Sequence, residues 1–418
     1  MRSAATMTAE PSSTSNASHT RRTVSGVAWN FLRVSAQTFL SLGVMAVLAR
    51  LLAPEDFGLM TLSMIFVGFA ELLTSLGMGL ALVQRKTLTD RDIRLAGTLS
   101  VLMGSVLLGL FWLGAEPLAG FFNNPAVSDI LKVLALGLWG TSFAAVSRGL
   151  LMRRLAFKQL LGIELSGYVV GHGLVSITLA LMGYGVWALV IGNLVAQFIS
   201  AAAAIAIVRP PMKPLWAPAE ARDMMHFGVG VSLNSSINYF AANADYAVIG
   251  KFMDSGVLGL YNRAYHLVTL PLTKIAATLT SVMFSAYAEV QDDLERIRAG
   301  YLRVVAATSL LTLPILTGFL VAGDLLIVGM FGDQWRDATP VFRILCIAGM
   351  FKSVFHLAGS VVQATGNVYA EVRRQLIYFT LLAGGCLWAA SHGIEAVALV
   401  VLAASAWMYL AMAALVRA

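Results

Sequence analysis

The segment Arg50-Leu-Leu-Ala-Pro-Glu-Asp-Phe-Gly58-Leu59 recurs in altered form as Lys251-Phe-Met-Asp-Ser-Gly-Val-Leu-Gly259-Leu260. Each copy follows a long apolar run and has a cation eight residues before a glycine, and the offset between the copies is 201 residues. Two further pairs of segments have offsets of 209 and 208 residues: Gly120-Phe-Phe-Asn-Asn124 with Gly329-Met-Phe-Gly-Asp333, and Gly185-Val-Trp-Ala-Leu-Val190 with Gly393-Ile-Glu-Ala-Val-Ala398. This steady spacing indicates a duplicated unit of about 200 residues.

The composition places both copies in a membrane. Of 418 residues, 58% are hydrophobic and 12% are charged, whereas a soluble globular chain has about 25% charged residues. A soluble fold would lack the polar residues to cover its surface, and a disordered chain would lack this apolar mass. The apolar residues are spread along nearly the whole sequence, which excludes a single anchor carrying a soluble catalytic domain. We therefore expect an integral membrane protein.

Apolar runs of about 20 residues, the length needed to cross a bilayer as a helix, predict an all-α membrane protein with about twelve transmembrane helices. The predicted organisation is a disordered cytoplasmic tail at 1–22, a six-helix bundle at 23–208, a cytoplasmic linker at 209–222 and a second six-helix bundle at 223–418. Because the end of the sixth helix near 208 corresponds to about residue 416 in the second copy, we expect the twelve helices to be complete. The helices are centred near Phe39, Val67, Val106, Leu136, Val170, Leu194, Phe240, Val268, Leu310, Ala348, Leu382 and Ser405.

The distribution of cations predicts the orientation. Of 29 Lys and Arg residues, nineteen lie in the tail, at the C-terminus or in loops after even-numbered helices, and three, Arg50, Lys251 and Arg336, lie in the opposite loops. Cations are retained on the cytoplasmic side, so both termini are expected to be cytoplasmic. Since each unit has an even number of helices, the two units enter from the same side. They are parallel repeats, an arrangement that places a central cavity between two bundles.

The other seven cations fall within or at the margins of predicted spans. Placing a cation at a lipid-exposed helix centre costs about 2.5–3.5 kcal/mol, so the presence of these cations in the spans requires a physical explanation. Lys132, Arg303 and Arg343 lie near helix ends and are expected to reach the headgroups. The remaining four are predicted to line a water-filled cavity, with internal ion pairs as the alternative: Arg33, Arg263, Lys274 and Lys352.

Helical periodicity groups these cations with other polar residues into stripes, each within about 60° around its helix. Helices one and seven are equivalent in the two repeats, so stripes on these helices are predicted to face each other across one passage. The stripes are Asn30, Arg33 and Gln37 in helix one, Asn234, Asn238 and Asp245 in helix seven, Arg263 and Lys274 in helix eight, and Lys352 and His356 in helix ten.

Three carboxylates within the spans, Glu71, Glu164 and Asp245, are expected either to pair with these cations or to carry a coupling H⁺ or Na⁺. For Glu164 pairing is at least as good an interpretation, because its helix also has Gly167 and Gly171 at the spacing of a helix-packing face. The excess of cations favours an anionic substrate such as a phosphate or pyrophosphate head group over a lipophilic cation.

Several classes of function lack their characteristic residues. No H-E-x-x-H, G-x-S-x-G or G-x-x-x-x-G-K-[ST] motif occurs, so a metalloprotease, a serine hydrolase and an ATP-driven pump are not indicated. Cys346 and Cys386 lie in apolar runs and are interpreted as packing residues. The net charge of +7 follows from cytoplasmic cations and does not indicate nucleic-acid binding. We expect a secondary transporter without a cofactor or metal, not an enzyme.

Four motifs in order along the chain resemble the Wzx-type polysaccharide flippases, which export O-antigen and exopolysaccharide units. The chain is most similar to the colanic-acid exporter-like branch of the superfamily that also contains lipid II flippases and multidrug extruders. The motifs are Arg50 to Leu59, Gly183-Tyr-Gly-Val-Trp-Ala-Leu-Val190, Gly259-Leu-Tyr-Asn-Arg-Ala264 and Phe331-Gly-Asp-Gln-Trp335.

The resemblance implies alternating access that moves an undecaprenyl-pyrophosphate-linked oligosaccharide across the bacterial inner membrane for lipopolysaccharide or exopolysaccharide synthesis. It implies cationic cavity residues for the pyrophosphate, a role carried over to Arg33, Arg263, Lys274 and Lys352, and a polysaccharide polymerase and chain-length machinery as partners. A multidrug extruder is one alternative. A membrane-embedded polymerase or ligase is another, although it would need a large outer loop and the outer segments 116–129 and 324–340 are short.

Overall fold

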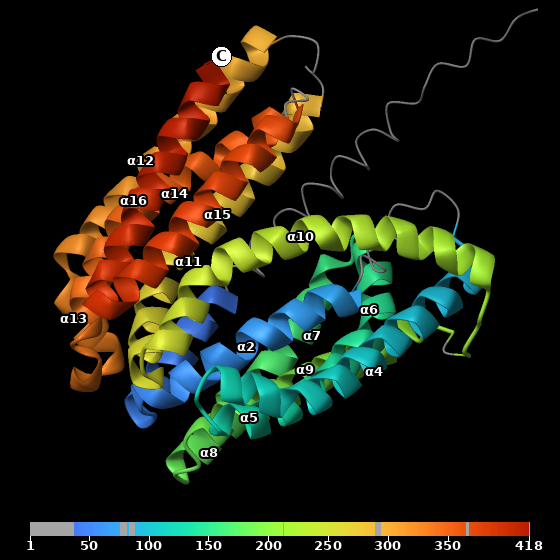
Figure 1. Cartoon of the computed structure of the whole chain (residues 1–418). Helices are drawn as coiled ribbons and strands as arrows, with labels where there is room; N and C mark the ends of the chain where they lie inside the picture. Colours follow the sequence, from blue (N-terminus) through green and yellow to red (C-terminus); the bar gives the residue numbers. More distant parts are fainter. Residues whose placement is uncertain are drawn as a thin grey trace, which may run out of the picture.

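The computed structural model describes residues 37–75, 82, 88–211, 213–288, 294–364 and 368–417, and all regular structure in these ranges is helical (Figure 1). The predicted tail at 1–22 lies outside these ranges. The first bundle contains the first helix (Gln37–Leu51), α2 (Pro54–Ser75), α4 (Asp90–Phe121), α5 (Ala126–Ala135), α6 (Gly137–Arg153), α7 (Phe157–Tyr168), the π-helix η1 (Val169–Ser176), α8 (Ile177–Leu181) and α9 (Val186–Val208). The rest of the chain forms α10 (Pro218–Phe252), α11 (Ser255–Ala288), α12 (Leu294–Val321), α13 (Gly323–Phe331), η2 (Asp333–Trp335), α14 (Ala338–Ala364), α15 (Val368–Ala389), η3 (Ala390–His392) and α16 (Ile394–Arg417).

The helices lie where the apolar runs predict them. Eight spans in the described ranges are long and apolar enough to cross a membrane. One predicted helix differs, because the segment centred on Leu136 is divided into α5 and α6 at that residue. Gly137, which begins α6, lies directly against the Gln197 side chain of α9. The protein is a multi-pass, all-helical membrane protein.

The boundary between the two bundles has a local cause. α9 ends at Val208, where Arg209 adopts a left-handed conformation, and Pro210 and Pro211 follow, which do not continue a helix. α10 begins at Pro218, a residue suited to the first helical turn. The predicted linker, 209–222, therefore includes the first turn of α10.

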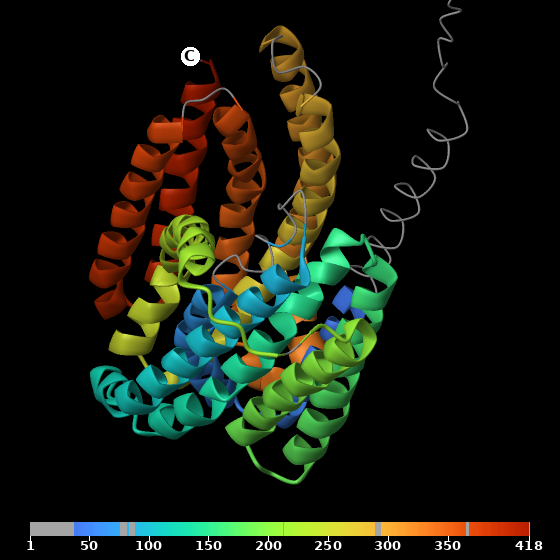
Figure 2. The same cartoon turned by 90° about the vertical axis from the view of Figure 1, so that its right-hand side faces the viewer.

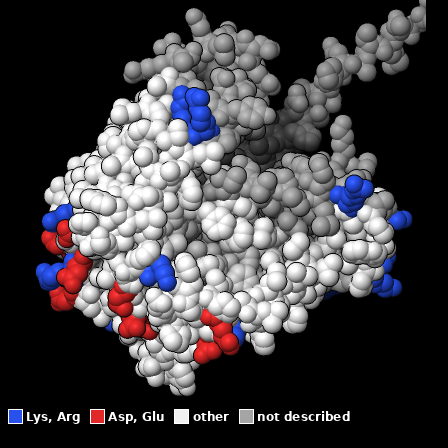
Figure 3. Space-filling model, viewed as in Figure 1, with Lys and Arg blue, Asp and Glu red and all other residues white. Residues whose placement is uncertain are grey.

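The helices form two groups that meet at one end (Figures 1 and 2). The helices up to α9 make up one group, α11 to α16 make up the other, and α10 runs along the first group before it joins the second. The C-terminal end of the first helix contacts α13 and η2, and the C-terminal end of α10 contacts that of α4. We call this end of the molecule the turn end. On the face shown in Figure 3, acidic side chains gather along the lower edge, whereas the charged side chains that are visible at the right-hand edge are cations.

The main contact between the bundles is the crossing of α2 and α11. A Cβ atom at Gly58 would collide with the carbonyl oxygen of Ser255, and one at Gly259 would collide with the carbonyl oxygen of Pro54. Gly58 and Gly259 are equivalent at the 201-residue offset, and so are Pro54 and Ser255. The crossing is therefore reciprocal, and it requires glycine because the two backbones touch.

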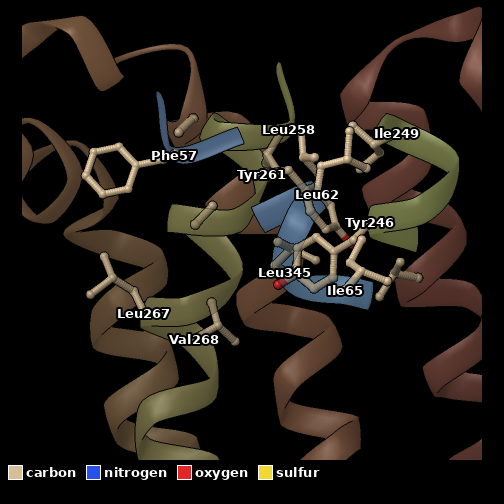
Figure 4. Packing of buried hydrophobic residues seen from close by; sticks show 14 of the residues in the cluster. Phe57, Leu62, Ile65, Tyr246, Ile249, Leu258, Tyr261, Leu267, Val268 and Leu345 are labelled. Carbon is tan, nitrogen blue, oxygen red and sulfur yellow. The ribbon is translucent and has the colours of Figure 1, made fainter. Parts of the chain in front are cut away.

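Buried side chains from α2, α10, α11 and α14 surround this crossing (Figure 4). Leu62 and Ile65 of α2 lie beside Tyr246 and Ile249 of α10, Phe57 lies at the other side of the cluster, and residues of α11 and α14 complete it. In a bilayer such a cluster is stabilised by close van der Waals packing, since lipid tails are as apolar as the side chains themselves. It fixes α11 between the two bundles.

The predicted packing face on the fifth span is confirmed. Gly167 lies against Ser200 and Ala196 of α9, and Gly171 lies against Ala196 and Gly192. Cys346 and Cys386 are buried free thiols, in agreement with their interpretation as packing residues.

Candidate functional site

A cavity of about 330 Å³ lies between the bundles. Its walls come from the first helix, α2, η1 and α9 on one side and from α11 on the other. We call it the inter-bundle cavity. Its polar lining residues are Gln37, Thr38, Ser41, Tyr168, His172, Arg263 and His266.

Arg263 provides the positive charge of this cavity. Its guanidinium lies 4.4 Å from the centre of the Phe57 ring, and its Nη2 donates a hydrogen bond of 2.8 Å to Oδ1 of Asn262. The Nε atom is buried and has no hydrogen-bond partner. No Asp or Glu is among the described residues that line this cavity. Because a buried donor without an acceptor is costly, Arg263 is poised to bind an anion.

Tyr168 and His172 form the opposite wall, and sequence reasoning did not assign them a role. Their rings are stacked at 4.7 Å with an interplanar angle of 8°, and Nδ1 of His172 is buried without a partner. His172 lies in the π-helix η1, and π-helical segments occur frequently at functional sites. The sequence contains one sign of a role for His172: it lies between Gly171 and Gly173, in a helix whose packing face includes Gly171.

A second cavity, of about 490 Å³, lies inside the second bundle between α10, α11, α14, α15 and α16. We call it the C-bundle cavity. Lys352 donates a hydrogen bond of 2.5 Å to the Tyr265 hydroxyl and lies 4.8 Å from the centre of that ring. Asp245, only 2% exposed, accepts hydrogen bonds from the Tyr261 hydroxyl at 2.6 Å and from the Tyr246 backbone N–H at 3.0 Å. This cavity thus contains both a cation and an anion.

Helix α11 separates the two cavities. Arg263, His266 and Leu270 line the inter-bundle cavity, whereas Tyr265 and Leu272 line the C-bundle cavity. At 100° per residue the first three lie within about 60° of one another, and Tyr265 lies about 160° away from Arg263. The two sets therefore occupy opposite faces of one helix.

The stripes of the first and seventh spans are predicted to face each other across one passage, but their described residues line different cavities. Gln37 and Arg263 line the inter-bundle cavity, whereas Asn238, Asp245 and Lys352 line the C-bundle cavity. The physical reason is that the stripe of the seventh span faces the interior of its own bundle, with α11 between it and the first helix.

The remaining predicted site residues have other positions. Glu71 accepts a hydrogen bond of 2.8 Å from Gln197 of α9, and Glu164 on α7 lines neither cavity. Asn30 and Arg33 lie outside the described residues. Lys274, Asn234 and His356 fall in α11, α10 and α14, but their side chains are not among those described.

Two of the cations near helix ends bind acids of their own bundle. Lys132 forms an ion pair with Glu116 at 3.1 Å, and Arg343 forms one with Asp324 at 2.8 Å. They differ in this from Arg263, which has no such partner in the described cavity lining. Among the described residues, no group of three His, Cys, Asp or Glu side chains is arranged to hold a metal ion.

Comparisons with known proteins agree with this architecture. A family model described as "Polysaccharide biosynthesis protein" matches residues 47–340. The chain is 26% identical to "Lipopolysaccharide biosynthesis protein WzxC" of Escherichia coli (strain K12), covering 83% of this chain and 71% of that protein. It is 27% identical to "Teichuronic acid biosynthesis protein TuaB" of Bacillus subtilis (strain 168), covering 83% and 72%.

Among solved structures, the fold is similar to "Lipid II flippase MurJ, inward closed conformation", with a TM-score of 0.77 and 14% identity, covering 92% of this chain and 87% of that one. The chain thus shares the fold of this protein. Together with the family match, this confirms the resemblance read from the sequence motifs. The chain belongs to the polysaccharide biosynthesis protein family, whose model covers most of its length.

Proposed function

We propose that the protein flips a polyprenyl-pyrophosphate-linked oligosaccharide from the cytoplasmic to the outer leaflet of the bacterial inner membrane, as a step in surface polysaccharide export. The observation that carries this proposal is Arg263, which lines a cavity between the bundles and whose buried Nε has no hydrogen-bond partner, while no acidic residue is among the described lining of that cavity. The relatives WzxC and TuaB are named for polysaccharide synthesis, and MurJ is named a lipid II flippase.

The proposed mechanism uses the inter-bundle cavity for the charged head group. Arg263 binds the pyrophosphate by charge-assisted hydrogen bonds, and Gln37, Thr38 and His172 offer hydrogen bonds to sugar hydroxyls. The prenyl chain stays in the lipid between the bundles. The bundles then rock about the crossing of α2 and α11 and expose the cavity on the other side. Both termini are cytoplasmic in this scheme, and the polymerase and chain-length machinery receive the product outside.

We assign coupling to the C-bundle cavity. Asp245 is a buried carboxylate whose two oxygens are bound by Tyr261 and Tyr246, and Lys352 lies in the same cavity. Entry of H⁺ or Na⁺ at Asp245 would change the balance of charge with Lys352 and so the electrostatic interaction between α10 and α14 across the cavity. Asp245→Asn should therefore remove the dependence of flipping on an ion gradient, measured in proteoliposomes with imposed pH or Na⁺ gradients.

The proposed function is tested by removing the positive charge of the inter-bundle cavity. Arg263→Ala should lower the flipping of undecaprenyl-pyrophosphate-linked saccharide in proteoliposomes by about tenfold or more, since a charge-assisted hydrogen bond contributes about 1.5–3 kcal/mol. Arg263→Lys should retain part of the activity. Arg336→Ala, a change at an exposed ion pair of the turn end, is the matched control. Flipping at the normal rate by Arg263→Ala would refute the proposal.

A multidrug extruder is the main rival within this fold. A cavity for lipophilic cations needs carboxylates, and the described lining of the inter-bundle cavity offers none. The protein should therefore give no resistance to cationic dyes in a strain without its own dye pumps. Dye efflux that Arg263→Ala leaves unchanged would favour the rival.

A further inference from the structure

Two cations at the turn end reach from one bundle to the other. Arg50, in the last turn of the first helix, donates from Nε to the carbonyl of Met330 at 3.1 Å and from Nη2 to the carbonyl of Gly329. Lys251, at the end of α10, donates to the carbonyl of Phe121 and lies 4.6 Å from the centre of that ring. Each cation therefore contacts the C-terminal turn of a helix in the opposite bundle, α13 or α4.

The two contacts are related by the internal repeat. Arg50 and Lys251 are equivalent at the 201-residue offset, and Phe121 and Met330 are equivalent at the 209-residue offset. The last carbonyls of a helix lack intrahelical partners and carry a partial negative charge, so they are acceptors that favour a cation. The same interaction is thus made twice, once in each direction across the contact between the bundles.

Further hydrogen bonds on one side tie η2 to the first helix. Gln334 donates to the carbonyls of Ala49 at 2.6 Å and Leu52 at 3.1 Å, and the indole of Trp335 donates to the carbonyl of Ala49 at 2.8 Å. The Trp335 ring meets Phe57 edge-on at 5.3 Å, and Phe57 is the ring beneath Arg263. The turn end therefore forms the closed end of the inter-bundle cavity.

We propose that Arg50 and Lys251 are a reciprocal latch that holds the turn end closed and is released when the cavity opens there. Separating the bundles at this end must break both contacts. The acceptors are carbonyls at the exposed surface, and hydrogen bonds to such groups exchange readily for water, which makes the latch reversible. The inference rests on the proposed function for two ideas: that the cavity opens alternately on its two sides, and that the turn end faces outward, as cytoplasmic termini would place it.

The third cation of this end supplies a matched control. Arg336 pairs with Asp333, three residues away, at 2.7 Å, and both residues are exposed. It has the same charge at the same end of the molecule, but the contact stays within one bundle. A general effect of charge at the turn end would appear in Arg336→Ala, whereas an effect of the latch would not.

The test measures access to the cavity and needs no substrate. Cys346 and Cys386 are replaced by Ala, and Met60, which lines the inter-bundle cavity, is replaced by Cys. Intact cells are treated with a membrane-impermeant thiol reagent. In the double variant Arg50→Ala/Lys251→Ala, labelling of M60C from outside should be at least about fivefold faster than in the parent, with each single variant in between. Arg336→Ala should label at the parental rate, and so should Arg50→Lys/Lys251→Arg.

Labelling of the double variant at the parental rate, or equal acceleration by Arg336→Ala, would overturn the latch. If the double variant does not insert, the single variants decide the question, because each removes one half of the pair. The labelling result is independent of the flipping assay. Full flipping activity of Arg263→Ala would refute the proposed function, but faster labelling of the latch variants would still support the latch.

Discussion

At the scale of residues, tyrosine hydroxyls hold the two charges of the C-bundle cavity. Asp245 accepts from Tyr261, and Lys352 donates to Tyr265, so each charged group has a neutral partner on α11. A buried carboxylate tolerates this position because its oxygens are hydrogen-bonded. The sequence shows Asp245 and Lys352 as charged residues within predicted spans. It does not show that Tyr261 and Tyr265 form hydrogen bonds with them.

Tyr261→Phe should therefore destabilise the protein. The change leaves the ring contacts with Tyr246 and Tyr265 intact and removes one donor to Asp245. An unsatisfied buried acceptor costs about 1–3 kcal/mol, so thermal unfolding in detergent should occur at a lower temperature. Tyr184→Phe, at an exposed tyrosine, is the control and should unfold like the parent. If Tyr261→Phe unfolds at the same temperature as the parent, the Tyr261 hydroxyl does not stabilise the buried Asp245.

At the scale of elements, the crossing of α2 and α11 depends on two glycines in contact with backbone. Gly58→Ala and Gly259→Ala should each lower the unfolding temperature, since the added Cβ would have to displace the carbonyl of Ser255 or Pro54. Overpacking of this kind costs about 1–3 kcal/mol. Gly109→Ala and Gly114→Ala on α4, where a Cβ meets nothing within 4 Å, should be neutral or slightly stabilising. An equal loss in all four variants would show that the crossing is not special.

Helix α11 also shows why the periodicity of one helix does not define a whole site. The 100° periodicity predicts the stripe through Arg263, whereas the opposite face of the helix, with Tyr265 and Thr269, lines a second cavity. A helix that borders lipid on one side lines a cavity with one face only. A helix between two cavities lines each of them with an opposite face, and the packing of the neighbouring helices decides which arrangement occurs.

At the scale of the whole molecule, the two cavities predict separable effects. Arg263→Ala should weaken the binding of undecaprenyl pyrophosphate by about tenfold or more, whereas Lys352→Ala should change it by less than about twofold, because Lys352 lies on the other side of α11. The measurement is a titration of purified protein in detergent.

The double variant should give an effect that is the sum of the single effects within about 0.5 kcal/mol, as for independent sites. Strong non-additivity, or an equal loss of affinity in both single variants, would instead support a single cationic cavity that contains both Arg263 and Lys352.

Much of the architecture followed from the sequence alone. The membrane class, the duplication, the positions of the helices and the small-residue face at Gly167 and Gly171 are local properties of composition and spacing, so they could be predicted from the chain. The division between two cavities, the tyrosine partners of Asp245 and Lys352, and the contacts of Arg50 and Lys251 with opposite helix ends were decided only by the tertiary structure. The physical reason is that periodicity shows which residues share a face but not which helix that face meets, and a backbone carbonyl that accepts a cation leaves no mark in the sequence.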